Sequence, residues 1–343
     1  MNILEYTLEG LTRYFELEHN KGNFHARALF REVFKKGNPD FFSAPEFRAS
    51  PRLSAALAGR IKTDPGKVVR VFEEENLTKF ITRLSDGLEI ESVIIPMTRY
   101  QTLCVSSQVG CRMGCRFCET GQMGFRRSLL VSEITGQLYN GRHTLGKNIK
   151  NVVFMGMGEP FDNFDAVMKA VLVMNEQKGF DVALSHITIS TAGLVPGINR
   201  LARMNLPNLR LAVSVNAADD KIRSGIMPVN RTYPLKALKK ALKDFPLSGR
   251  GTFLLEYILI RGVNDSLGHA QKLSEFIGSL PVRLNLIPFN PVSGFEAHPS
   301  CDEDMHRFAA YLGERGIFVI KRWSKGRSVS AGCGQLGKTM DQD

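Results

Sequence analysis

The sequence is poor in the features that define several common protein classes. Its 343 residues include only one tryptophan. They also include only six cysteines, which are too few in a chain of this length for the disulfide framework of a small secreted domain. No apolar run approaches the roughly 18–20 residues that a membrane-spanning helix needs. We find no internal repeat and no low-complexity segment, which argues against a repeat protein. The composition instead favours a globular chain with one large domain and an appendage, or two domains.

The N-terminal segment also lacks the marks of a signal peptide. Residues 1–20 carry several acidic side chains and have no basic start, apolar stretch or small-residue cleavage site. We therefore expect a cytoplasmic protein with no membrane partner.

The charge balance is strongly basic. Lys and Arg number 45 against 34 Asp and Glu, which gives a net charge of +11. Such a field attracts a polyanion such as RNA. A basic protein without a nucleic-acid partner fits the charge equally well, so charge alone leaves both alternatives open.

Residues 1–85 are expected to form a helical accessory domain, whose contact with RNA is implied by the resemblance described below. Apolar side chains recur there every three or four residues, as on the buried face of a helix. Helices are predicted at residues 8–18, 24–36 and 50–61. The same part is locally basic, through Lys35, Lys36, Arg52, Arg60 and Lys62.

The pattern changes after the helical part, and we expect an α/β domain over residues 86–343. Two strands joined by a tight turn come first, followed by about six strand–helix units, which predicts parallel crossovers. Six units fall short of the eight in a closed barrel, so the prediction is a partial (β/α)6 barrel with functional residues at the C-terminal ends of its strands. Strands are expected at 78–84, 88–97, 101–107, 151–156, 186–191, 209–215, 252–260, 282–289 and 317–323, and helices beginning near Val131, Asp165, Pro196, Pro234, Ser266 and Asp302.

Three of the six cysteines follow the first barrel strand in a tight group. Cys111, Cys115 and Cys118 are spaced C-x3-C-x2-C. Structural zinc usually takes four ligands, and no fourth Cys or His follows nearby, although a zinc-binding protein remains an alternative. Iron–sulfur clusters are held by thiolates, and three thiolates would leave one iron open. The spacing therefore favours one 4Fe-4S cluster with a vacant coordination site.

This cysteine loop resembles that of the radical S-adenosylmethionine (SAM) superfamily, whose members fold as partial or full β/α barrels. The resemblance implies that the open iron binds SAM and that an electron cleaves it to a 5′-deoxyadenosyl radical.

A closer resemblance is carried by several motifs in order, which is more specific than one motif. The chain is similar to the RNA adenine methyltransferases that methylate C2 of an adenine in 23S rRNA and tRNA. The resemblance covers about residues 20–340. Its motifs are CVSSQVGCRMGCRFCETGQMGF, VVFMGMGEP, ITISTAGLVP, LAVSVNA, GVNDS, NLIPFNP and AGCGQL.

The resemblance implies a SAM-binding set at the ends of successive strands. Taken singly, each of these residues could equally cap a helix or form a turn. Together they would line one rim of the barrel. The implied SAM contacts are Gly158, Glu159, Ser190, Ser214, Val215, Asn216 and Asn290.

The resemblance also implies three catalytic residues outside the cluster loop. Cys333 would accept a methyl group from a first SAM, and a radical from a second SAM would activate that group for addition to adenine. Cys104 would then release the product by forming a disulfide with Cys333. Glu91 would accept the proton of the adenine carbon. From the residues alone, Cys333 could equally be an incidental cysteine. Glu91 is better explained, without the family, as a solvated strand residue. Cys301 matches nothing in the family.

Some positions depart from the family pattern. Asn216 stands where relatives commonly have His, and Gly332 where they usually have Ala. The segment 325–330 before Cys333 is basic, where relatives carry aspartates. These departures leave the choice of RNA open.

Two rival functions and several partners complete the prediction. The rivals are C8 methylation or another radical SAM modification of RNA, and a non-enzymatic RNA-binding protein with a structural metal. We expect a monomer that receives electrons from a donor such as flavodoxin or ferredoxin. Candidate RNA contacts near the barrel rim are Arg126, Arg127, Lys321, Arg322 and Lys325.

Overall fold

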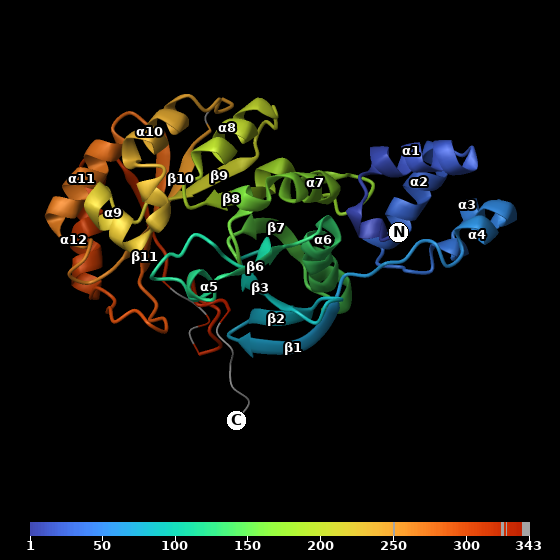
Figure 1. The fold of residues 1–343 in the computed structure, drawn as a ribbon, viewed down its shortest axis with the longest axis horizontal. Helices are drawn as coiled ribbons and strands as arrows, with labels where there is room; N and C mark the ends of the chain where they lie inside the picture. The colour runs from blue at the N-terminus through green and yellow to red at the C-terminus, as the bar shows by residue number, and fades with distance from the viewer. Residues whose placement is uncertain (250, 324–325, 327, 338–343) are drawn as a thin grey trace.

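The computed structural model describes residues 1–249, 251–323, 326 and 328–337. The N-terminal helices lie to one side of a large α/β body (Figure 1). That body is built on one ten-stranded sheet with the order β1-β2-β3-β4-β7-β8-β9-β10-β11-β12. No described helix is long and apolar enough to cross a membrane.

The N-terminal part is helical, as expected. The predicted helix at 24–36 is helical throughout its length because a π-helical turn, η2 (Arg31–Lys35), directly continues α2. A short 3-10 helix, η1 (Ile3–Glu5), joins this part to the barrel, since the carbonyl oxygen of Leu4 accepts a hydrogen bond from Thr135 at 2.8 Å. The helices are α1 (Leu8–His19), α2 (Asn23–Phe30), α3 (Pro45–Arg48) and α4 (Pro51–Leu57).

The expected domain boundary at residue 85 is wrong. The last helix of the N-terminal part ends at Leu57, and the two strands that follow lie within 1–85. These are β1 (Lys67–Glu74) and β2 (Leu77–Arg83), which pair antiparallel with each other, while β2 also pairs with β3 (Glu89–Pro96). The sequence hid β1 because it is an edge strand with several charged residues and no fully buried side chain.

The rest of the sheet is parallel and confirms the partial barrel. β4 (Gln101–Cys104) pairs antiparallel with β3 and parallel with β7, and every later pair is parallel. β1 and β12 are the two ends of the sheet order, so the barrel stays open. The remaining parallel strands are β7 (Ile149–Phe154), β8 (Ile187–Thr191), β9 (Arg210–Ser214), β10 (Phe253–Leu259), β11 (Val282–Pro288) and β12 (Phe318–Lys321).

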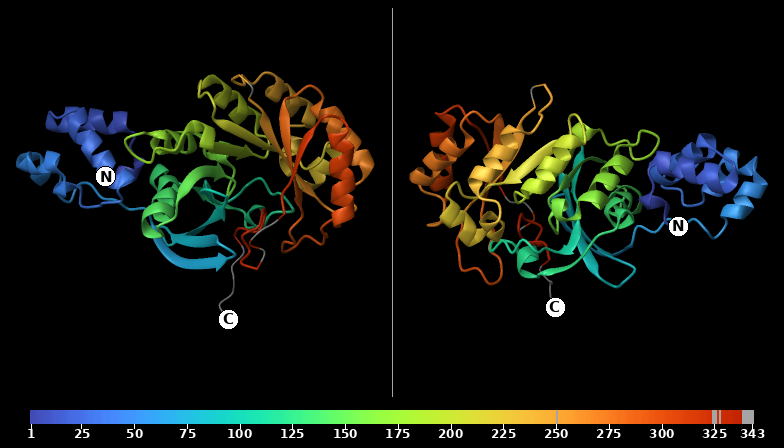
Figure 2. Two further views of the ribbon diagram at one scale, coloured as in Figure 1. Left: turned by 180° about the vertical axis from the view of Figure 1, so that it is seen from behind. Right: turned by 45° about the horizontal axis from the view of Figure 1, so that its top comes forward.

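Six long helices make the crossovers between these strands and begin within one residue of the predicted starts. They cover the outer face of the curved sheet (Figure 2). Their apolar faces and the sheet form one large core, since most strand residues are fully buried. The helices are α6 (Val131–Tyr139), α7 (Phe164–Asn175), α8 (Val195–Arg203), α10 (Leu235–Lys243), α11 (Leu267–Ile277) and α12 (Asp302–Gly313).

Short elements that the sequence did not reveal carry the cysteine loop and the rim. Between β4 and α6 the chain forms β5 (Gln108–Gly110), α5 (Glu119–Gln122) and β6 (Phe125–Ser128), with β5 and β6 paired antiparallel. α9 (Asp220–Ile226) follows β9. The C-terminal segment returns to lie beside α5 in both views (Figures 1 and 2), where the Glu119 amide donates to the Gly334 carbonyl oxygen at 2.7 Å.

Candidate active site

The three clustered cysteines open into one cavity at the C-terminal ends of the strands. Cys111, Cys115 and Cys118 all line this cavity, whose volume is about 170 Å³. Burial raises the pKa of the Cys111 thiol to about 12 and raises the pKa values of the Cys115 and Cys118 thiols as well. Each thiol therefore needs a strongly positive ligand to become a thiolate, and a metal centre supplies that charge.

The number of these thiols suits a 4Fe-4S cluster with one open iron. Among the residues that the structure describes, no three His, Cys, Asp or Glu side chains are placed to hold one metal ion. A 4Fe-4S cluster is larger than one ion and presents a separate iron to each thiolate. The three cysteines therefore fit the cluster that their spacing predicts.

Glu159 is the principal carboxylate of the cavity and lies directly after β7. It follows Gly158, whose positive φ of +96° and close approach to Gln108 leave no room for a side chain. The Glu159 carboxylate accepts hydrogen bonds from the amides of Phe161 (3.1 Å) and Ala192 (2.7 Å). Burial raises the pKa of Glu159 to about 7. A cationic ligand in this cavity, such as the ammonium group of SAM, would favour the ionised form.

The next two strands supply the small polar residues that were predicted. Ser190 of β8 lines the cavity, as do Ser214 and Asn216 at the end of β9. Asn216 has a left-handed backbone with φ +54°, and its Oδ1 accepts the Ile258 amide at 2.8 Å. Asparagine tolerates this conformation, so the departure from His at this position leaves the strand end intact.

Two residues of the expected SAM set do not line the cavity. The side chain of Val215 is fully buried in the core, because successive residues of an extended chain face opposite sides. Asn290 is buried beside the cavity, and its Nδ2 donates to the Cys333 carbonyl oxygen at 2.9 Å. The Asn290 Oδ1 is buried and has no hydrogen-bond partner among the described residues. This unsatisfied acceptor fits a ligand that brings a donor, as SAM does.

Sequence reasoning missed Arg223, whose side chain supports the strand ends at the edge of the cavity. Its fully buried guanidinium donates to the carbonyl oxygens of Val215 (2.9 Å), Ala192 (2.7 Å) and Ser214 (3.0 Å). One side chain thus fixes the backbones that carry the ends of β8 and β9. Nothing local in the sequence marks Arg223, because its partners lie up to 31 residues away.

Glu256 was also missed, although it does leave a sequence signal. It is an acid within the otherwise apolar strand FLLEYIL, and it lines the same cavity from β10. Its Oε1 accepts a hydrogen bond from Asn285 Nδ2 at 2.7 Å, and burial raises the pKa of Glu256.

Cys333 lies on the wall of the same cavity, on the C-terminal segment. It is exposed, and the surrounding protein raises the pKa of its thiol to about 11. Cys104, at the end of β4, is buried outside the cavity lining, and burial together with the nearby Cys333 thiol raises its pKa to about 12. Both are free thiols in the structure. The fold therefore brings together two cysteines that are far apart in the sequence.

Glu91 is not the solvated residue that the strand pattern alone suggests. It is buried on β3, and its Oε2 lies 2.9 Å from Nζ of the fully buried Lys79 on β2. The same oxygen accepts a hydrogen bond from the Gly337 amide at 3.1 Å. Glu91 therefore touches the segment that carries Cys333.

The candidate RNA contacts divide into free and engaged groups. Arg126, Lys321 and Arg322 are exposed. Arg127 is instead held by Asp86 at 2.6 Å and Glu133 at 2.7 Å. Lys325 lies outside the described residues. The five basic residues predicted in the N-terminal part are exposed, but Lys36 pairs with Glu32 at 2.9 Å and Lys62 with Asp64 at 3.2 Å. The other three are Lys35, Arg52 and Arg60.

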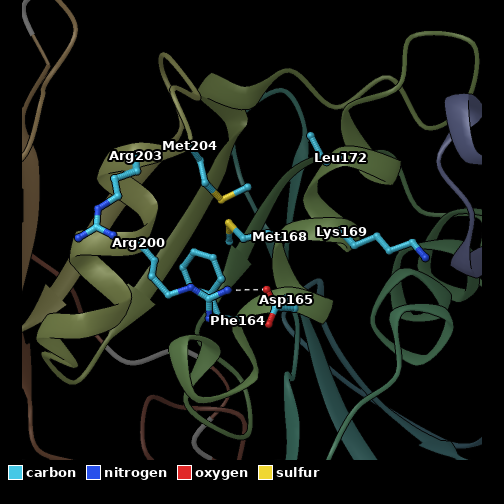
Figure 3. A pocket seen from close by; sticks show the side chains of 8 residues that line it. All are labelled: Phe164, Asp165, Met168, Lys169, Leu172, Arg200, Arg203 and Met204. Carbon is cyan, nitrogen blue, oxygen red and sulfur yellow. Dashed lines mark hydrogen bonds and ion pairs between the residues drawn. The ribbon is translucent and has the colours of Figure 1, made fainter.

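A larger hollow of about 470 Å³ lies on the outer face between α7 and α8 (Figure 3). Arg200 crosses it, stacked over the Phe164 ring at 4.0 Å and paired with Asp165 at 2.6 Å. Methionine and leucine side chains from the two helices line the remainder. It contains none of the predicted site residues, so the smaller cavity at the strand ends is the candidate active site.

Comparison with protein families gives the same assignment as the geometry. The family described as the Radical SAM superfamily matches residues 105–273. A probable dual-specificity RNA methyltransferase RlmN 1 of Protochlamydia amoebophila is 40% identical over 337 residues, which cover 98% of this chain and 94% of that relative. A dual-specificity RNA methyltransferase RlmN of Geobacter sulfurreducens is 38% identical over 99% of this chain and 93% of its own length.

A solved structure is similar over the full length of the chain. The crystal structure of a radical SAM methyltransferase from Sphaerobacter thermophilus superimposes with a TM-score of 0.90 at 35% sequence identity. The match covers 98% of this chain and 99% of that one. The likeness thus includes the N-terminal helices as well as the barrel.

Proposed function

Because the chain belongs to the radical SAM family of dual-specificity RNA methyltransferases, we propose that it methylates C2 of an adenine in both 23S rRNA and tRNA. One observation carries the proposal beyond family membership. The three cluster cysteines, the SAM-binding positions Glu159, Ser190 and Ser214, and Cys333 all open into one cavity. A methyl donor, a radical source and a methyl acceptor can therefore meet there.

Cys111, Cys115 and Cys118 hold the 4Fe-4S cluster, and the residues at the ends of β7, β8 and β9 hold SAM. When bound, the cluster and SAM supply the electron, the methyl group and the radical that the reaction requires. An indirect route is needed because the C2–H bond of adenine is neither acidic nor nucleophilic. A carbon carried on the protein solves this difficulty.

We assign that carrier role to Cys333. Its thiol loses a proton and gains a methyl group from a first SAM. The S-methyl group then gives one hydrogen atom to the radical that a second SAM would supply, and the resulting methylene radical adds to adenine C2. The Cys104 thiolate then attacks the Cys333 sulfur and breaks the carbon–sulfur bond. The leaving carbon takes up a proton to become the methyl group of the released RNA, and the disulfide that remains must be reduced before the next cycle. Glu91 accepts the proton from C2.

Several partners belong to the same proposal. A small electron-transfer protein such as flavodoxin or ferredoxin reduces the cluster, and the enzyme acts as a monomer in the cytoplasm, where ribosomal and transfer RNA are made. The exposed basic residues of the N-terminal helices and of the barrel rim support contacts with the RNA backbone.

Methyl loading of the protein tests the carrier role. Reconstituted Cys333→Ala is expected to take up no label from methyl-labelled SAM, whereas the wild type takes up one methyl group per chain. Cys301→Ala is the matched control, because Cys301 is exposed at the start of α12 and lies outside the cavity. All three proteins should contain about four irons per chain. Loading of Cys333→Ala equal to that of the wild type would exclude the proposed carrier.

A further inference from the structure

Lys79 is buried in an unusual way. Its side chain has 0% exposure in the middle of β2, and lysine is almost never fully buried unless it is paired. Its Nζ lies 2.9 Å from the Oε2 atom of Glu91 and donates a hydrogen bond to the Ser330 carbonyl oxygen at 3.2 Å. Lys79 pairs with Val93 across the two strands, so Glu91 is its diagonal neighbour on the same face.

The ion pair holds the Cys333 segment on both sides. Lys79 binds Ser330 before the cysteine, and Glu91 Oε2 accepts the Gly337 amide at 3.1 Å after it. The other carboxylate oxygen of Glu91, Oε1, has no hydrogen-bond partner among the described residues. The Oε2 atom of Glu91 is therefore fixed by Lys79 and by the Gly337 amide.

We propose that Lys79 is a positioning residue of the methylation reaction, whose ammonium group holds Glu91 ready to accept the C2 proton beside the Cys333 segment. This inference rests on the proposed function. At the step concerned, the methylene carbon on Cys333 is bonded to adenine C2 and the adduct has lost its unpaired electron, which a bound iron–sulfur cluster would accept. The C2–H bond then breaks, its electron pair restores the ring double bond, and the proton goes to the Glu91 carboxylate.

We expect the Lys79–Glu91 pair to affect proton transfer to Glu91 more than the position of Cys333. Three further contacts dock the segment without Lys79. Asn290 Nδ2 donates a hydrogen bond to the Cys333 carbonyl oxygen at 2.9 Å. The Glu119 amide donates to the Gly334 carbonyl oxygen at 2.7 Å. Thr120 Oγ1 donates to the Leu336 carbonyl oxygen at 2.5 Å. Without Lys79, by contrast, the buried Glu91 carboxylate loses its charged partner, so its Oε2 atom is no longer fixed beside the Gly337 amide.

The test compares Lys79→Met with Lys147→Met. Lys147 pairs with Glu73 of β1 at a comparable distance, 2.8 Å, but this pair is more exposed and includes no residue of the Cys333 segment. We expect Lys79→Met to load its methyl group as the wild type does and to keep the RNA KM, because Lys79 has no exposed surface. Its kcat should fall at least about tenfold, as loss of a general base does, with accumulation of the covalent protein–RNA adduct. Lys147→Met should turn over normally.

Two further measurements separate positioning from general damage. Hydrogen exchange of the cluster-free protein should be faster at the Gly337 amide in Lys79→Met than in Lys147→Met. Adding Lys79→Met to Glu91→Gln should cause no additional loss of kcat, since Lys79 acts through Glu91.

Full turnover of Lys79→Met, or an additive loss in the double variant, would overturn the inference even if the wild type methylates RNA. A wild type that loads Cys333 but never modifies RNA would instead overturn the proposed function.

Discussion

Cys104 and Cys333 have thiols whose pKa values are raised to about 12 and about 11. Both are therefore protonated at neutral pH until the reaction removes their protons. A protonated thiol is a weaker nucleophile than a thiolate, so each cysteine reacts only after its proton is removed. Cys104 is shielded by burial, whereas Cys333 is exposed on the cavity wall, where a ligand can reach it.

Removing the second thiol should stop the reaction at the covalent stage. In Cys104→Ala, Cys333 can load its methyl group and bond to the RNA, but no thiolate is available to attack the sulfur. We expect a protein–RNA adduct that survives denaturing electrophoresis and is visible with labelled RNA. Cys301→Ala should release its product as the wild type does. Free methylated RNA in excess of enzyme from Cys104→Ala would contradict this role.

Glu159 should make SAM binding depend on pH. Burial raises its pKa from an ordinary 4.5 to about 7, so the unliganded fold holds a proton that the unfolded chain releases. Its ionisation therefore costs the unliganded fold stability as pH rises from about 4.5 to about 7. In the proposed site, SAM binds the ionised form through its ammonium group, so SAM affinity should increase about tenfold between pH 6 and pH 8.

Equilibrium binding to the reconstituted protein measures this dependence, with Glu159→Gln as the control. The neutral amide should bind SAM weakly at both pH values. An equally steep pH dependence in Glu159→Gln would show that another group is responsible.

Residues could be predicted from the sequence where their partners are close in the chain. The spacing of Cys111, Cys115 and Cys118 within one loop points directly to a metal centre. The pairing of Lys79 with Ser330 joins positions 251 residues apart, and no local pattern contains it. The roles of Cys104 and Cys333 came from the family resemblance alone, because their proximity arises only from the fold.

The loop after β7 is an element whose shape depends on one glycine. Gly158 has φ +96°, and a Cβ there would lie 2.5 Å from the Cβ of Gln108. Gly158→Ala should therefore destabilise the protein by about 2–4 kcal/mol, as overpacking at a strained backbone does, and should weaken SAM binding.

Gly146→Ala is the matched control for that prediction. Gly146 also has a positive φ, +66°, but no atom lies within 4 Å of the position that a Cβ would take there. Only the left-handed backbone is penalised at this site, which costs about 1–2 kcal/mol. Urea denaturation of the cluster-free proteins measures both values. Equal losses in the two variants would mean that the contact with Gln108 is unimportant.

Helices and strands were easier to predict from the sequence where their pattern of apolar residues was stronger. The strands and helices of the parallel barrel have long apolar runs and clear turn residues, and they lie where expected. β1, β5, β6 and α5 were missed because they are short or lie at an edge, and tertiary contacts decide their conformation. The predicted domain boundary near residue 85 was misplaced for the same reason, because the sequence of β1 does not show that this strand belongs to the sheet.

The whole molecule combines a basic surface with a cavity that holds the reactive groups. The net charge of +11 and the exposed basic helices attract RNA of any sequence. Charge therefore does not select the target, and the chemistry at the strand ends can act only on a base that leaves its stack. Neither charge nor fold distinguishes C2 from C8 of adenine, which is why the product itself must be identified.

Chromatography with mass spectrometry of nucleosides tests the central claim most directly. Ribosomal and transfer RNA from a strain with this chain and from one without it are digested and compared with standards of the two isomers. We predict 2-methyladenosine in both RNA classes only when the chain is present. Its absence from both classes, or the appearance of 8-methyladenosine in its place, would contradict the proposed function.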